Sequence, residues 1–258
     1  MTLAPCHTAH VYQTYDGPDT AEAQLQRRRV ELGELPRRYA EPWGRPFFDV
    51  VRPALEPGAV ILDVGAGRSP VLPPEARPEN ARYVGLDIAA TELDAAGAGA
   101  YDETVVGDIG RPLPALAERF DLVLSWQVLE HVESLDAALD NMRAYLRPGG
   151  LLVAHLSGRF AAYAVVARVI PNRLSRSLID RLLGVDPSFP THYQACHASA
   201  LERRLGRWSA HGIEPRYKGG AYFRFSRPLE RAYLAYENWV ERSGRADLAT
   251  HYLIWAVK

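Results

Sequence analysis

The most constraining feature of this sequence is the stretch from residue 60 to residue 68, which reads VILDVGAGR. A run of aliphatic residues that ends at Gly-x-Gly is typical of a buried parallel strand that leads into a tight turn. Gly65 and Gly67 have no Cβ, so the turn can adopt positive φ and a ligand can lie against bare backbone. Asp63, at the end of the strand, can fix this turn or face a cation. We therefore expect a ligand site where the strand ends.

The composition limits which proteins can carry this stretch. The chain has 258 residues, 47% of them hydrophobic, and a formal net charge of -1. This length suits one α/β domain with an added cap, and the near-zero charge argues against a nucleic-acid partner held through phosphate contacts. Cys6 and Cys196 are too few for a disulfide scaffold or a thiolate zinc site, which favours a reducing cytoplasm. The sequence shows no secretory signal and no apolar run of about 20 residues, so we expect no integral membrane contact.

Strand and helix patterns alternate along the middle of the chain. The predicted second to fifth strands are Arg82–Asp87, Glu103–Val106, Asp121–Ser125 and Leu151–His155. Leu135, Leu139, Met142 and Leu146 recur at helical spacing before Pro148. This alternation predicts a doubly wound, parallel α/β sheet with ligands at the carboxyl ends of its strands.

Acidic and apolar residues follow the second and third strands. Asp87 ends the second strand, where a carboxylate can accept hydrogen bonds from both hydroxyls of a ribose. Asp108 can accept a hydrogen bond from an exocyclic amine, while Ile88 and Ile109 can sandwich a purine. Each acid alone could simply cap a turn or a helix, because Asp is preferred at such positions. Together with Asp63 they place acids at three successive strand ends, which favours an adenosine site.

Pro70 sets this stretch apart from the nicotinamide-binding pattern. It stands at the position where G-x-G-x-x-G requires a third glycine for close packing of helix against strand. Pro73, Pro74 and Pro78 leave little room for a full helix before the second strand. A nicotinamide dehydrogenase is therefore disfavoured.

Five motifs occur in a familiar order: VILDVGAGRSP, VGLDIA, VVGDIG, FDLVLSWQVLEHV and LRPGGLL. Over residues 57–156 this set resembles the class I S-adenosylmethionine-dependent methyltransferases, and a weaker similarity to a bacterial subgroup continues through FPTHY at residues 189–193. The resemblance implies a mostly parallel seven-stranded sheet with an antiparallel edge strand, and S-adenosyl-L-methionine as the cofactor. The implied cofactor residues are Asp63, Gly65, Ala66 and Gly67 for the methionine part, Asp87 for the ribose, Asp108 and Ile109 for the adenine, and Ser125 and Trp126 beside the sulfonium. Ile88 joins them through the purine sandwich described above.

The rest of the chain predicts a domain organisation around this core. We expect a helical lid over residues 1–56, the cofactor-binding core over 57–156, a substrate cap over 157–200, and completion of the sheet over 201–258. Apolar residues mixed with arginine between positions 160 and 183 suit either a helical cap or a segment on an anionic membrane surface, and the cap is favoured. In a helix over Pro228–Glu241, we expect Leu229, Tyr233 and Trp239 to be buried.

Few residues are needed for catalysis, because a sulfonium methyl group is already an activated electrophile. The candidate bases are His131, which follows the fourth strand, and His192 in the cap, since neutral imidazole has a pKa near neutrality. His131 could instead be structural, and Tyr193 could position a substrate oxygen or merely pack. Glu130 and the nearby histidines lack a metal-ligand spacing, so we predict no metal.

The sequence thus predicts a biosynthetic methyltransferase. The acceptor would be a small molecule, a glycan or a lipid intermediate, and the histidines and aromatic residues of the cap favour oxygen over nitrogen or carbon. The alternative is a non-catalytic nucleotide-binding scaffold or regulatory subunit with the same fold.

Overall fold

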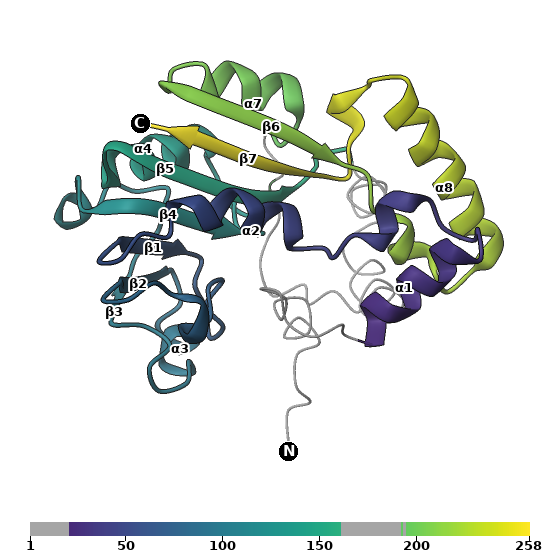
Figure 1. The fold of residues 1–258 in the computed structure, drawn as a ribbon. Coiled ribbons are helices and arrows are strands. Elements are labelled where there is room, and N and C mark those ends of the chain that lie inside the picture. Colours follow the sequence, from purple (N-terminus) through teal and green to yellow (C-terminus); the bar gives the residue numbers. More distant parts are fainter. Residues whose placement is uncertain (1–20, 161–191, 193–194) are drawn as a thin grey trace.

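A seven-stranded sheet forms the centre of the protein (Figure 1). The computed structural model describes residues 21–160, 192 and 195–258. The strand order is β3-β2-β1-β4-β5-β7-β6. The strands are β1 (Val60–Val64), β2 (Arg82–Asp87), β3 (Glu103–Val106), β4 (Phe120–Trp126), β5 (Leu146–Ser157), β6 (Ala210–Arg216) and β7 (His251–Val257). Strands β1 to β5 are parallel, and β7 runs antiparallel between β5 and the outermost strand β6. The predicted mostly parallel α/β sheet is confirmed.

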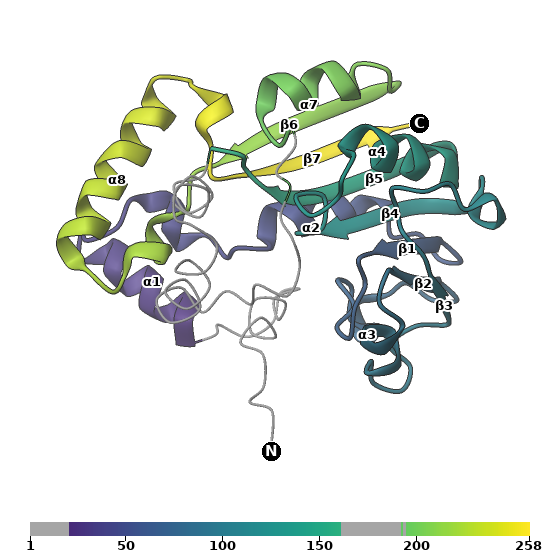
Figure 2. The same ribbon diagram turned by 180° about the vertical axis from the view of Figure 1, so that it is seen from behind.

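Helices cover both faces of this sheet. The helices of the described ranges are α1 (Ala21–Glu31), α2 (Arg45–Val51), α3 (Ala90–Asp94), α4 (Leu135–Tyr145), α7 (Ala198–Leu205) and α8 (Arg227–Arg242). Helix α2 packs on one face, while α4 and α7 pack on the other (Figures 1 and 2). Alternate residues of the central strands point to the two cores, as Ile61 does to one and Leu62 to the other. The strands are therefore apolar on both sides.

Local sequence signals explain where α4 begins and ends. The side chain of Ser134 caps the helix by accepting a hydrogen bond from the Ala137 N–H at 3.2 Å. Its apolar residues at three- and four-residue spacing, among them Leu139 and Met142, are buried against the sheet. The helix ends at Tyr145, and β5 begins at Leu146, earlier than the sequence pattern predicts.

The connection between β1 and β2 contains no α-helix, as the prolines predict. Its described elements include only the 3-10 turn η4 (Pro74–Ala76). The other 3-10 turns are η2 (Arg37–Ala40), η3 (Arg52–Ala54), η5 (Pro114–Leu116), η6 (Gly220–Phe223) and η7 (Ala246–Leu248). Proline supplies no N–H for helix propagation, so the chain passes from the turn after β1 to β2 through loops.

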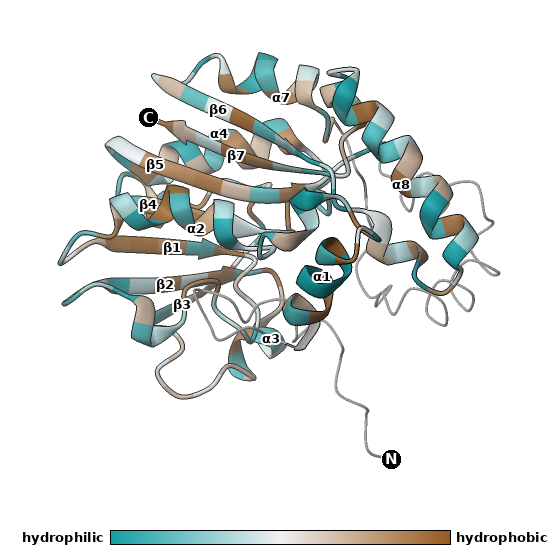
Figure 3. Ribbon diagram, turned by 45° about the vertical axis from the view of Figure 1, so that its right-hand side comes forward, coloured by the Kyte–Doolittle hydropathy of each residue, from teal (hydrophilic) through white to brown (hydrophobic). Residues whose placement is uncertain are grey.

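Helix α8 lies at the outer edge of the molecule, beside α1 and away from the sheet (Figures 1 and 3). Tyr233 is buried, as predicted, but Leu229 is 42% exposed and Trp239 is 49% exposed. The prediction that these two residues are buried is wrong. Glu230 and Glu237 lie on the inner side of the helix instead. They pair there with two arginines of the N-terminal segment, the part of the chain from α1 to η2. Arg29 pairs with Glu230, and Arg38 pairs with Glu237.

The remaining expectations concern the organisation of the chain. The boundaries of the lid, core, cap and C-terminal part stay predictions, and most of the predicted cap lies outside the described residues. None of the helices in the described ranges has the length and apolar character needed to cross a lipid bilayer.

Candidate cofactor and acceptor site

The turn after β1 is built from two glycines with positive φ, +73° at Gly65 and +52° at Gly67. A Cβ at Gly65 would lie 2.1 Å from the Cγ2 of Val128, so this turn packs directly against the loop that follows β4. The Tyr101 hydroxyl donates to the carbonyl oxygens of Ala66 at 2.7 Å and Gly67 at 3.1 Å. Tyr101 thus holds the backbone of the turn, Val128 packs against it at Gly65, and an added Cβ at Gly67 would meet only Asp87 Oδ2 at 4.0 Å. No sequence motif around Tyr101 indicates that its hydroxyl holds the glycine turn.

Asp63 lies beneath this turn and is completely buried. Its Oδ2 accepts hydrogen bonds from the Val71 N–H at 2.8 Å and the Tyr83 hydroxyl at 2.7 Å. Burial raises the pKa of Asp63 to about 7, since removal from water disfavours the charged form. Its Oδ1 has no hydrogen-bond partner within the described ranges. These contacts show that Asp63 fixes the loop after the glycine turn.

Asp87 connects the glycine turn to the end of β2 by hydrogen bonds. Its Oδ2 accepts from the Gly67 N–H at 2.9 Å, and its Oδ1 accepts from the Ala89 N–H at 2.8 Å. The side chain is half-buried, and a carboxylate oxygen has more than one acceptor position, so Asp87 can still accept hydroxyl groups of a ligand. The adjacent Ile88 is 62% exposed. The glycine turn, an accessible carboxylate and an exposed apolar side chain therefore lie together at the carboxyl ends of β1 and β2, and this combination fits an adenosine-type cofactor.

The two predicted adenine residues differ in their surroundings. Asp108 is half-buried and accepts a hydrogen bond from the Gly110 N–H at 2.8 Å. Ile109 is only 6% exposed, and its carbonyl oxygen accepts from the Asn141 amide at 2.7 Å. The Asn141 contact fixes the backbone of this loop. The assigned contacts of both residues with adenine stay predictions.

Ser125 and Trp126 end β4, and both are buried. The Ser125 Oγ and the Trp126 Nε1 have no hydrogen-bond partner among the residues that the structure describes. Gln127, the next residue, has φ +56°, and its N–H donates to the His155 carbonyl oxygen at 2.7 Å. A positive φ is uncommon for glutamine and tends to occur where surrounding structure imposes it, often at functional sites. The sequence carries no local signal for this conformation.

An aromatic stack continues from Trp126 across β5 and β7. The Trp126 and His155 rings stack with centroids 4.5 Å apart, and those of His155 and His251 lie 5.4 Å apart. Trp43 meets His251 edge-on at 4.7 Å. Burial lowers the pKa of His155 well below its usual value and that of His251 to about 3, so both imidazoles are neutral near pH 7. The sequence motifs did not point to this stack, because it depends on the antiparallel pairing of β5 with β7.

The two candidate catalytic histidines lie on neighbouring segments of backbone. The half-buried His131 donates its main-chain N–H to the Val128 carbonyl oxygen at 2.9 Å. His192 is exposed, and its main-chain N–H donates to the Glu130 carbonyl oxygen at 3.0 Å. The structure thus places His192 beside the loop whose Val128 packs on the glycine turn. The predicted Tyr193 lies outside the described residues. Within the described ranges, no cluster of His, Cys, Asp and Glu suits a metal ion.

Comparison with known proteins places this geometry in a family. Residues 33–213 match the family described as a methyltransferase domain. A ubiquinone biosynthesis O-methyltransferase of Methylobacterium sp. (strain 4-46) is 36% identical over 132 residues, which are 48% of this chain and 52% of that protein. The chain thus spans only about half the length of this curated relative.

Solved structures show the same fold at low sequence identity. A SAM-dependent methyltransferase from Archaeoglobus fulgidus has a TM-score of 0.51 and 17% identity, covering 98% of this chain and 100% of that one. A Haemonchus contortus phosphoethanolamine N-methyltransferase, solved with phosphomonomethylethanolamine and S-adenosylhomocysteine, has a TM-score of 0.53 and 14% identity. The match covers 84% of this chain and 52% of the Haemonchus contortus chain. These likenesses support the fold. The Haemonchus contortus enzyme is named for N-methylation, whereas the curated relative is named for O-methylation.

Proposed function

Since this chain belongs to the class I S-adenosylmethionine-dependent methyltransferases, with S-adenosylmethionine as the cofactor, we propose that it methylates an oxygen atom of a small-molecule acceptor. The observation that carries the choice of oxygen is the 36% identity to a ubiquinone biosynthesis O-methyltransferase. One fold hosts many chemistries, so the acceptor follows from this sequence similarity and from the site, and not from the fold.

The proposed cofactor contacts follow from the strand ends. Asp87 would accept the ribose hydroxyls while it holds the Gly67 N–H, and the exposed face of Ile88 would lie against the adenine. Gly67, where an added Cβ would meet only Asp87 Oδ2 at 4.0 Å, would let the methionine part approach the backbone, while Gly65 lets the turn pack against Val128. When bound, the cofactor supplies an activated methyl group, so the protein's task is to align the acceptor and exclude water.

The proposed acceptor side begins at Trp126. Its buried ring and the stacked His155 form a rigid wall at the carboxyl ends of β4 and β5. Ser125 Oγ and Trp126 Nε1 lack partners within the described part of the chain, so these two polar groups can orient a ligand at this end of the sheet.

We assign proton removal to His192. Its side chain is exposed next to the loop after β4, whereas His131 is half-buried in that loop. The imidazole of His192 would accept the proton of a phenolic hydroxyl as that oxygen is methylated. His131 would then position the loop, and Tyr193 would orient the acceptor oxygen.

The test is methyl transfer from isotopically labelled S-adenosylmethionine to a panel of phenols, catechols, amines and activated carbon acids. NMR of the labelled methyl group distinguishes O-, N- and C-methyl products. The proposal predicts O-methyl products from phenolic acceptors. N- or C-methyl products alone would contradict it, and cofactor binding without any turnover would favour the scaffold alternative.

Two histidine variants assign the base. His192→Gln should lower kcat by about 100-fold or more with little change in cofactor affinity, because general base catalysis typically contributes that much. It should also remove the acidic limb of the pH profile. His131→Gln is the matched control and should leave that limb in place. If His131→Gln removes the limb and His192→Gln does not, the assignment must be reversed.

A further inference from the structure

The outer side of α8 carries large apolar side chains that face solvent. Leu229 is 42% exposed, Tyr236 is 38% exposed and Trp239 is 49% exposed. These residues lie at helical spacing on one side, together with the exposed Ala232. Phe225, just before the helix, is 52% exposed. Exposed aromatic residues gathered on one helix face are characteristic of a docking surface.

The acidic residues of α8 are turned away from this outer side. Glu230 is buried and forms a bidentate ion pair with Arg29, with both oxygen–nitrogen distances at 3.0 Å. Glu241 pairs with Arg38 at 2.8 Å. The negative charges of the helix are thus used to hold the N-terminal segment, and they do not offset the charge of the outer side.

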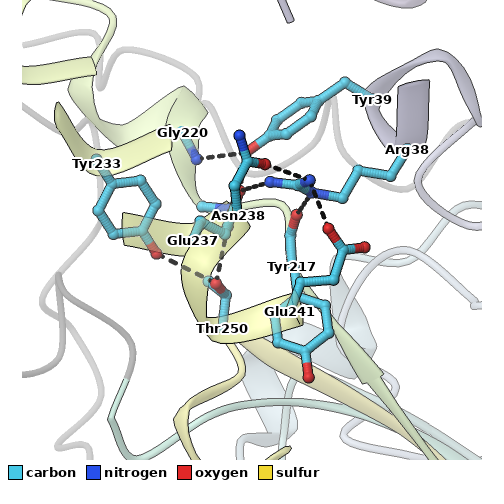
Figure 4. Close-up of polar contacts among 10 residues, drawn as sticks. Arg38, Tyr39, Tyr217, Gly220, Tyr233, Glu237, Asn238, Glu241 and Thr250 are labelled. Atoms are coloured by element: carbon cyan, nitrogen blue, oxygen red, sulfur yellow. Dashed lines mark hydrogen bonds and ion pairs between the residues drawn. The ribbon is translucent and has the colours of Figure 1, made fainter. Parts of the chain in front are cut away.

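Glu237 fixes the orientation of the helix most strongly (Figure 4). Its buried carboxylate accepts from Arg38 at 2.8 Å and from the Tyr39 hydroxyl at 2.7 Å. It also accepts from the Gly219 N–H at 2.6 Å and the Thr250 hydroxyl at 3.1 Å. Four donors from three other segments therefore hold the Glu237 side of α8 against the rest of the protein. The apolar side faces outward.

The charges left on the outer side are positive. Arg231 and Arg242 are exposed and eleven residues, or three helical turns, apart, so they lie along one edge of the apolar side. Neither forms an ion pair with any carboxylate in the described ranges. Arg245 lies over the Trp239 ring, 5.0 Å from its centroid. A shallow hollow of about 480 Å³ opens on this side, lined by Ala235, Asn238, Trp239, Arg242 and Ser243.

We propose that this outer side of α8 docks on an anionic phospholipid surface. Tryptophan and tyrosine favour the boundary between headgroups and acyl chains, because one end of each side chain is polar and the other apolar. Arginines beside them are attracted to anionic headgroups, and the three acids of α8 pair instead with Arg29 and Arg38 on the other side of the helix. A helix with an apolar face bordered by arginines lies in the plane of such an interface.

The experiment is co-sedimentation of the full chain with lipid vesicles. One set contains phosphatidylcholine alone, and the other contains phosphatidylcholine mixed with phosphatidylglycerol. We expect binding to the anionic vesicles, weakened by salt, and little binding to phosphatidylcholine. Replacing both Arg231 and Arg242 by Gln should weaken anionic binding by about thirty-fold, because each arginine near such a surface contributes roughly five-fold. Trp239→Ala should weaken the binding that remains at high salt, because the apolar contact dominates there.

The matched control removes two exposed arginines elsewhere. Arg147 and Arg207 pair with acids on other parts of the surface, and their replacement by Gln changes the net charge equally. This control should bind anionic vesicles like the unchanged chain. Equal loss in both double variants would refute docking through α8, as would the absence of vesicle binding in the unchanged chain. If Trp239→Ala instead changes the molar mass in light scattering, the face binds a second copy and the proposal is wrong. Cofactor affinity of every variant, measured in parallel, separates these outcomes from failure of the proposed methyl transfer.

Discussion

Replacing Gly65 by Ala tests the contact between the glycine turn and the loop after β4. The new Cβ would lie 2.1 Å from the Cγ2 and 3.0 Å from the Cγ1 of Val128, well inside van der Waals contact. Overpacking of this kind typically costs about 1–3 kcal/mol. The positive φ of +73° adds about 1–2 kcal/mol for a residue with a Cβ. We therefore expect a loss of about 2–5 kcal/mol in free energy of unfolding and a marked loss of S-adenosylmethionine affinity.

Two further variants separate the parts of this cost. Gly58 has φ +77° but nothing within 4 Å of an added Cβ, so Gly58→Ala carries only the backbone cost of about 1–2 kcal/mol. Adding Val128→Ala to Gly65→Ala removes both clashing methyl groups and should restore part of the stability and of the cofactor affinity. Urea denaturation and calorimetric titration measure the two quantities. Equal destabilisation by Gly58→Ala and Gly65→Ala, or no rescue by Val128→Ala, would refute the packing argument.

Four other expectations follow from the site and its support. Asp87→Asn should weaken S-adenosylmethionine binding by roughly ten- to hundred-fold, since hydrogen bonds to a charged group contribute about 1.5–3 kcal/mol, and unchanged titration calorimetry would contradict this role. Tyr101→Phe removes the hydroxyl that holds the turn carbonyls and should lower stability by about 1–2 kcal/mol in urea denaturation. Glu237→Ala should cost about 3–5 kcal/mol, because the Arg38 Nη2, the Tyr39 hydroxyl and the Gly219 N–H lose their buried acceptor, and a loss below 1 kcal/mol in the same assay would argue against the network. His251 has a lowered pKa, so the stability that depends on its neutral form is complete above about pH 6.5 and is lost as pH falls toward about 3. The free energies of unfolding from urea denaturation at pH 7.5 and pH 5 should therefore differ by about 2 kcal/mol less in His251→Gln than in the unchanged chain.

Local signals explain how much of the sheet could be predicted from sequence. The boundaries of β2 and β3 are as predicted, because each strand combines a short apolar or β-branched run with a following Asp or Gly. The glycine turn was also predicted, since positive φ at Gly65 and Gly67 is what glycine permits and other residues resist. The lack of a full helix after β1 followed from the prolines.

What could not be predicted depends on contacts between distant segments. The stack of Trp126, His155 and His251 exists because β7 pairs with β5, and no short-range pattern specifies that register. The burial of Glu237 and the exposure of Trp239 reverse what hydrophobicity alone predicts, because arginines from the N-terminal segment pair with the glutamates of α8. Apolar periodicity identified this helix correctly and assigned part of its inner side wrongly.

The most direct test of the central claim is calorimetric titration of the purified chain with S-adenosylmethionine, S-adenosylhomocysteine and NAD in parallel. The two sulfur nucleotides should bind with one site each, and Asp87→Ala should abolish both while NAD shows no binding to either protein. Binding of NAD alone, or of none of the three, would contradict the assignment of the glycine turn and Asp87 to S-adenosylmethionine.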